Sequence, residues 1–111
     1  MNFTFALMAM GAFGVSGTAK VTGAPDTRLA ADHLGMSRGE FRFIGVIELL
    51  GVLGVTTGLF VTGIGVATAI TLLLLMAGAV SMHLLSGDGL RGSLLPLLAA
   101  TVLTGYLMTL T

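Results

Sequence analysis

Four ionisable residues of this chain have types and positions that suit chemistry at a membrane boundary. They are Lys20, Glu48, His83 and Asp88. A carboxylate and an imidazole that lie close together can act as an acid–base pair. They can equally be the few polar groups that orient a lipid-like ligand in an apolar pocket. Either use requires that helices far apart in the sequence bring these side chains together.

Glu48 is the most informative of the four, because it interrupts an apolar run. It is the only charged residue from Phe43 to Val61. An ionisable side chain at membrane depth is costly and is usually paired or functional. Two interpretations stay open: Glu48 is a structural tie between helices, or it handles a proton or a ligand.

Counting residues places Glu48 and His83 at similar depth. Glu48 lies six residues after Arg42, so about 9 Å into the membrane, and His83 lies five residues before Asp88, so about 7.5 Å in. Lys20 and Asp88 would lie above them at the boundary. We therefore expect the four side chains to face one region, provided that their helices turn them toward each other.

Each of these residues also has a simpler role. Lys20 can be an anchor that extends its ammonium group to water, and Asp88 can cap a turn or a helix. His83 alone is more often a hydrogen-bonded histidine than a catalytic one. We interpret His33 as solvated, and Tyr106 as an aromatic side chain at the outer membrane boundary.

The composition predicts an integral membrane protein. Of 111 residues, 55% are hydrophobic and 9% are charged, whereas a soluble domain has roughly 25% charged residues. The net charge is zero, and no basic patch suggests nucleic acid. The absence of cysteine excludes disulfides and thiolate metal sites. The histidines and carboxylates are too few and too scattered to predict a metal site.

Four apolar segments predict an all-α fold, a single domain over residues 1–111 built as an antiparallel bundle of four transmembrane helices. Each segment has about the 20 residues that a spanning helix needs, and a segment in lipid must be helical to satisfy its backbone. The first segment lacks the basic start of a signal peptide, so we favour a membrane helix there. The predicted helices cover residues 3–20, 40–61, 64–85 and 90–110.

The loop over residues 21–39 is the main polar segment. Pro25 can begin a short interfacial helix that continues to Leu34. Ser37, followed three residues later by Glu40, has the pattern of a capping box. Lysine and arginine occur in the first and third loops, which predicts that these loops are cytoplasmic and that both termini are outside.

Three glycines in the second apolar segment predict close helix packing. Gly51, Gly54 and Gly58 lie along one region of that helix, and small residues let backbones approach closely in lipid. Packing within the chain is the simpler interpretation. A homodimer face is the alternative.

The chain resembles the DoxX-like family of four-helix membrane proteins. The pattern G-x-x-E-L-x-G over 45–51 carries the resemblance, together with SGTAKVTGAP at the end of the first helix. His83 followed by Gly87-Asp88 fits that family, and it is also similar to the related acetylcholine-receptor chaperone branch.

The resemblance implies a bundle in a bacterial plasma membrane and leaves the activity open. Its relatives include a subunit of a thiosulfate–quinone oxidoreductase, members of superoxide-detoxifying complexes and, more distantly, sterol isomerases. By that analogy Lys20, Glu48, His83 and Asp88 are the positions of interest. No cysteine or evident haem or iron–sulfur ligation is present, so no cofactor is evident and a quinone is the ligand to consider.

Three functions follow from these observations. The first is a non-catalytic membrane subunit that binds a quinone or another lipid-like ligand, with Glu48 and His83 as polar anchors. The second is a small enzyme that uses Glu48 and His83 as an acid–base pair on a lipophilic substrate. The third is an assembly or chaperone-like scaffold that holds a membrane partner or a second copy of the chain through its glycine-lined faces.

Overall fold

A computed structural model describes residues 3–111, apart from the side chains of residues 90 and 91. Over this range the chain is helical and contains no strand, which confirms the all-α prediction. The elements are α1 (Thr4–Thr22), α2 (Pro25–His33), α3 (Arg38–Gly58), α4 (Thr62–Leu85), α5 (Gly89–Gly92) and α6 (Leu94–Leu110).

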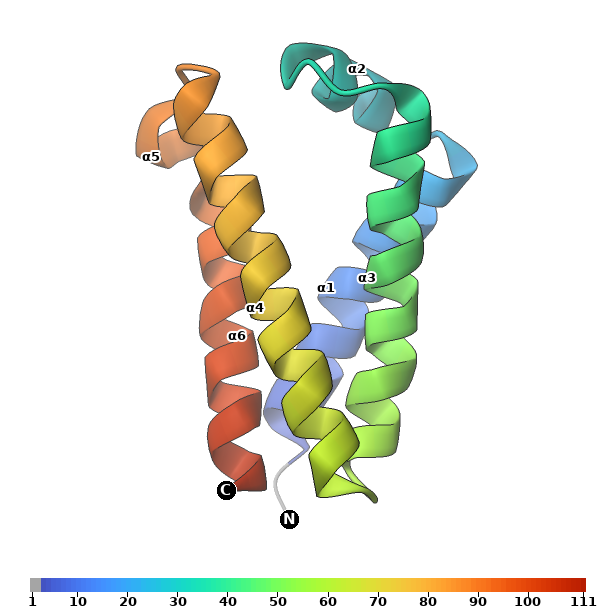
Figure 1. The fold of residues 1–111 in the computed structure, drawn as a ribbon, viewed down its shortest axis with the longest axis vertical. Coiled ribbons are helices and arrows are strands. Elements are labelled where there is room, and N and C mark those ends of the chain that lie inside the picture. The colour runs from blue at the N-terminus through green and yellow to red at the C-terminus, as the bar shows by residue number, and fades with distance from the viewer. Residues whose placement is uncertain (1–2) are drawn as a thin grey trace.

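The four long helices run alternately up and down, and each packs against two others. Helix α1 packs on α3, α3 on α4, α4 on α6, and α6 on α1. Both termini lie at one end of the molecule, and the short helices α2 and α5 lie at the other (Figure 1). The first and third connections therefore share one end, as an alternating arrangement requires.

Local sequence signals explain how the polar end is built. Gly23 ends α1 with a φ of 71°, a backbone conformation that glycine adopts without strain. Pro25 then occupies the first turn of α2. Ser37 and Glu40 form the capping box at the start of α3, with both bonds at 3.1 Å, which confirms that prediction.

The segment expected over residues 90–110 contains two helical pieces. The single turn α5 precedes α6, which starts at Leu94. Ser93 occupies the N-cap position of α6 but makes no side-chain cap bond. Its hydroxyl instead donates to the carbonyl of Gly89 at 3.3 Å. Pro96 lies in the first turn of α6, where a missing backbone N–H is tolerated.

The outer surface of the long helices is strongly apolar. Helices α3 and α4 are each long and apolar enough to cross a membrane, and α6 is a shorter apolar helix of 17 residues. A soluble protein rarely leaves so much apolar surface exposed. The most exposed of these side chains include Val15, Leu53, Leu74, Leu85 and Leu95.

The core is small and lies where the helices meet. Tyr106 is fully buried, and its hydroxyl donates to the carbonyl of Val55 at 2.8 Å. The interpretation of Tyr106 as a boundary aromatic is therefore wrong. Leu72 and Leu103 fill the same cluster. The hydrogen bond between Tyr106 and Val55 ties α6 to α3 across the molecule.

The three glycines of α3 face α4. A Cβ at Gly51 would lie 2.8 Å from a methyl carbon of Leu72, and one at Gly54 would collide with Thr68. Gly58 lies against the backbone of Gly65. Larger residues at these positions would push the helices apart, so the stripe serves packing within the chain.

Candidate functional site

The first polar group ties α1 to α3. The Lys20 ammonium nitrogen Nζ lies 2.8 Å from Oε1 of Glu48. The Ser16 hydroxyl donates to Oε2 of Glu48 at 3.0 Å. Glu48 is only 2% exposed, and Lys20 is 18% exposed. Lys20 Nζ also lies 5.1 Å from the centre of the Phe41 ring, a cation–π distance.

The local sequence explains why these partners meet. Ser16 and Lys20 are four residues apart on α1, so they share one face of the helix. Glycines then let the two helices approach closely. A Cβ at Gly45 would lie 2.7 Å from the Cβ of Lys20, and one at Gly17 would lie 2.9 Å from the carbonyl of Gly45. The carboxylate of Glu48 therefore enters a tightly packed interface with both of its oxygens bonded.

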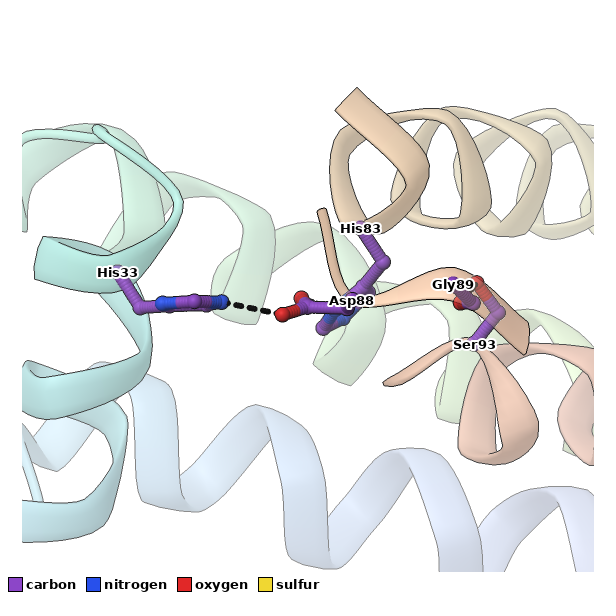
Figure 2. Close-up of polar contacts among 5 residues, drawn as sticks. All are labelled: His33, His83, Asp88, Gly89 and Ser93. Carbon is purple, nitrogen blue, oxygen red and sulfur yellow. Dashed lines mark hydrogen bonds and ion pairs between the residues drawn. The ribbon is translucent and has the colours of Figure 1, made fainter. Parts of the chain in front are cut away.

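The second polar group joins α2 to the turn after α4. Nδ1 of His83 lies 2.8 Å from Oδ2 of Asp88, and Nε2 of His33 lies 2.5 Å from Oδ1 of the same carboxylate. Figure 2 shows His33 and His83 reaching Asp88 from different elements. The contact between His33 and Asp88 spans 55 residues of sequence.

Asp88 sets the protonation pattern of this group. An ionised carboxylate can only accept, so each histidine donates the N–H that faces it. The hydrogen bond from His83, followed by that from His33, lowers the pKa of Asp88 below its ordinary value. Asp88 is therefore a carboxylate at neutral pH.

This arrangement leaves one ring nitrogen of His83 for other chemistry. Its Nδ1 proton is held by Asp88, and Nε2 makes no hydrogen bond to any other described side chain or backbone group. His83 is 24% exposed and Asp88 is 19% exposed. A carboxylate that orients an imidazole in this way can make Nε2 a proton acceptor, or a donor when the ring is protonated.

The structure divides the four predicted residues into two pairs. Lys20 is paired with Glu48, and His83 is paired with Asp88. Among the described residues, no hydrogen bond or ion pair joins Glu48 to His83. Residue counting predicted that all four side chains face one region, with Glu48 and His83 as a pair, and it did not predict the two pairs that the structure forms.

Sequence reasoning missed two members of these groups. Ser16 had a usable signal, because it lies one helical turn before Lys20 on the same face. His33 was interpreted as solvated, and it is 54% exposed, yet it contacts Asp88. No local pattern could have indicated that contact, because it depends on how α2 folds back over the end of the molecule.

Two hollows lie between the helices. A partly open cavity of about 80 Å³ lies between the ends of α1, α2 and α3, and its lining includes Lys20 and Arg42. A groove of about 210 Å³ lies between α3 and α4, with Leu50 and Thr71 in its lining. In the described part of the chain, no group of three or more histidine and carboxylate side chains is arranged to hold a metal ion.

Comparison with known proteins identifies a family. A family model described as the DoxX-like family matches residues 4–106, nearly the whole chain. The matched range includes both polar pairs. No curated protein and no solved structure matches the chain.

Proposed function

The chain belongs to the DoxX-like family of membrane proteins, and on that premise we propose that it crosses a bacterial plasma membrane four times. Helices α2 and α5 lie at the cytoplasmic face in this topology, and both termini lie outside. The alternating direction of the long helices supports it (Figure 1). The basic character of the end that carries α2 also supports this topology, since loops rich in lysine and arginine stay in the cytoplasm.

The function proposed is that of a non-catalytic subunit in a membrane redox or stress-related complex. It binds a quinone or another lipid-like ligand, and the His83–Asp88 pair is the polar anchor. The observation that carries this proposal is the state of His83, which Asp88 orients while Nε2 remains available and the ring is partly exposed.

Glu48 has a different role in this proposal from the one expected from the sequence. Its carboxylate is buried and bonded to Lys20 and Ser16. Binding a ligand there would require breaking a buried ion pair, which is strongly unfavourable. Glu48 therefore holds α1 and α3 together, and the ligand is anchored by His83.

The chemistry of a quinone suits this histidine. A protonated His83 can donate from Nε2 to a quinone carbonyl, while a neutral one can accept from a quinol hydroxyl. The apolar exterior of the long helices would receive the remainder of such a ligand. Most ligand sites combine apolar lining with a few placed polar groups in this manner.

Binding of a short-chain ubiquinone to the purified protein in detergent micelles tests this function. His83→Ala should weaken binding at least about fivefold, the effect of losing one hydrogen bond of about 1 kcal/mol. Ser81→Ala is the matched control, since it removes an exposed hydroxyl from the same helix. Equal affinity of His83→Ala and the unmodified protein would reject the proposal.

A small membrane enzyme is the second candidate, and the same geometry favours it. An imidazole held by a carboxylate is the arrangement of a general base. His83 and Asp88 would then replace the Glu48–His83 pair expected from the sequence. Asp88→Asn should lower turnover of a lipophilic substrate while the protein still folds. If the purified chain turns over no such substrate, the subunit function is favoured.

A further inference from the structure

The cavity between the ends of α1, α2 and α3 has an unusual charge. Its lining includes four basic side chains and no carboxylate. The whole chain has only five lysines and arginines, so most of its positive charge gathers around this one hollow. The four are Lys20, Arg28, Arg38 and Arg42.

The arginines of this cavity are not neutralised by acids. Lys20 is paired with Glu48. Among the described residues, none of the three arginines makes a salt bridge to a carboxylate. Arg28 donates from Nε to the carbonyl of Gly23 at 2.9 Å, which fixes its side chain but leaves its charge uncompensated. Three like charges around one hollow repel each other, so an anion placed there would be stabilised.

The volume of the cavity suits a small anionic group. About 80 Å³ is room for several water-sized groups, because one water needs about 10–15 Å³. It is well below the roughly 300 Å³ at which pockets begin to hold drug-sized ligands. A phosphate group fits within this volume.

The arginine side chains that line the cavity also suit phosphate. Guanidinium groups bind phosphate oxygens through two parallel hydrogen bonds. The buried Phe41 ring contributes an apolar wall to the cavity. Exposed Leu29 and Phe43 lie on the same helices, α2 and α3. A ligand with a phosphate head and apolar chains would find both kinds of partner at this end of the molecule.

We propose that this cavity binds the phosphate of an anionic ligand, with Arg28, Arg38 and Arg42 as the groups that contact it. The inference rests on the proposed membrane topology, which places the cavity at the cytoplasmic boundary where anionic lipids accumulate. It is independent of the quinone site at His83. A phospholipid headgroup and free inorganic phosphate share the required chemistry, and the experiment distinguishes them.

The experiment titrates the purified full chain in non-ionic detergent and counts bound molecules by native mass spectrometry. The probes are phosphatidylglycerol, phosphatidylcholine and inorganic phosphate. The variant Arg38→Gln/Arg42→Gln removes two exposed charges and keeps similar side-chain length. The matched control is Arg38→Lys/Arg42→Lys, which retains the charge. Elution volume and melting temperature verify that each variant is folded.

The expected result is tighter binding of phosphatidylglycerol than of phosphatidylcholine. The glutamine variant should lose roughly 25-fold in affinity, since each basic residue near anionic lipid contributes roughly a fivefold factor. The lysine variant should retain most of the affinity. Inorganic phosphate that displaces phosphatidylglycerol from the unmodified protein would identify free phosphate as a ligand of the same site.

Equal binding of the two lipids, or an unchanged affinity in the glutamine variant, would overturn the proposal. The same samples are also titrated with short-chain ubiquinone. Because His83 does not line the cavity, ubiquinone binding should survive in the glutamine variant. The anion site and the quinone site can therefore fail separately.

Discussion

The two polar groups of this protein use similar side chains in different surroundings. Between α1 and α3, the carboxylate of Glu48 is 2% exposed and meets Lys20 at a glycine-lined contact. At the end of the molecule, Asp88 is 19% exposed and meets His83 and the 54%-exposed His33. The first group is enclosed by two long helices, whereas the second joins a short helix to a turn.

The difference in burial decides what each group can do. A buried ion pair is costly to separate, because the charge left behind has no water to replace its partner. A partly exposed group can exchange its partners for water at little cost. Glu48 therefore suits a permanent structural tie. The His83–Asp88 group can open, accept a ligand and respond to pH.

The largest expected effect comes from removing one partner of the buried pair. Lys20→Met leaves the Glu48 carboxylate buried without its cation. We expect the free energy of unfolding to fall by about 3 kcal/mol. Thermal or denaturant unfolding in detergent micelles measures this change.

The double variant Lys20→Met/Glu48→Leu is the control for that experiment. Replacing both members of a buried pair by apolar residues is often neutral, so stability should largely return. If Lys20→Met alone left stability unchanged, the pair would not be a structural tie.

Tight packing around the buried pair gives the second prediction. Gly17→Ala places a Cβ 2.9 Å from the backbone carbonyl of Gly45. Because the backbone cannot move aside easily, we expect the free energy of unfolding to fall by about 2 kcal/mol. Gly11→Ala on the same helix is the matched control, since nothing lies within 4 Å of its added Cβ. The free energy of unfolding of that variant should rise by up to about 1 kcal/mol, because alanine favours a helix more than glycine does.

A smaller and local effect is expected at the exposed group. His33→Ala removes the link between α2 and Asp88. Amide hydrogen exchange in α2 should become faster, while exchange at the α1–α3 interface stays the same. Asp32→Ala removes a neighbouring exposed side chain and should leave α2 unchanged. Unaltered exchange in α2 of His33→Ala would show that the contact does not hold this helix.

The exposed group should also respond to acid. The pKa of Asp88 is lower in the folded protein than its ordinary value of 3.8. A carboxyl group with a lowered pKa stabilises the fold above its ordinary pKa, and that contribution disappears as pH falls through the folded value. Measured against the intrinsic exchange rate at each pH, the protection of α2 amides should therefore fall below about pH 4. Asp88→Asn should abolish this acid-dependent step.

Some parts of the fold and site could be predicted because they depend on neighbouring residues. The capping box needs only Ser37 and Glu40, three residues apart, and the structure confirms it. The family resemblance is likewise confirmed over residues 4–106. The prediction of four membrane crossings remains a proposal, since length and composition qualify only α3 and α4 in the described structure.

Other features depend on helix rotation, which residue counting does not provide. Counting gave depth for Glu48 and His83 but not the direction in which each side chain points. The structure turns Glu48 toward α1 and His83 toward Asp88. Tyr106 was misplaced for the same reason, because an aromatic near a helix end can face either the boundary or the core.

The sequence by itself determined the helical class, the apolar exterior and the types of residue available for chemistry. Those properties follow from composition and from patterns within a few residues. Tertiary structure decided which charges meet. It enclosed Glu48 with Lys20, joined His33 to Asp88 across 55 residues, and gathered the arginines around one cavity. Such contacts depend on the rotation and close approach of whole helices, and these result from packing over the entire chain.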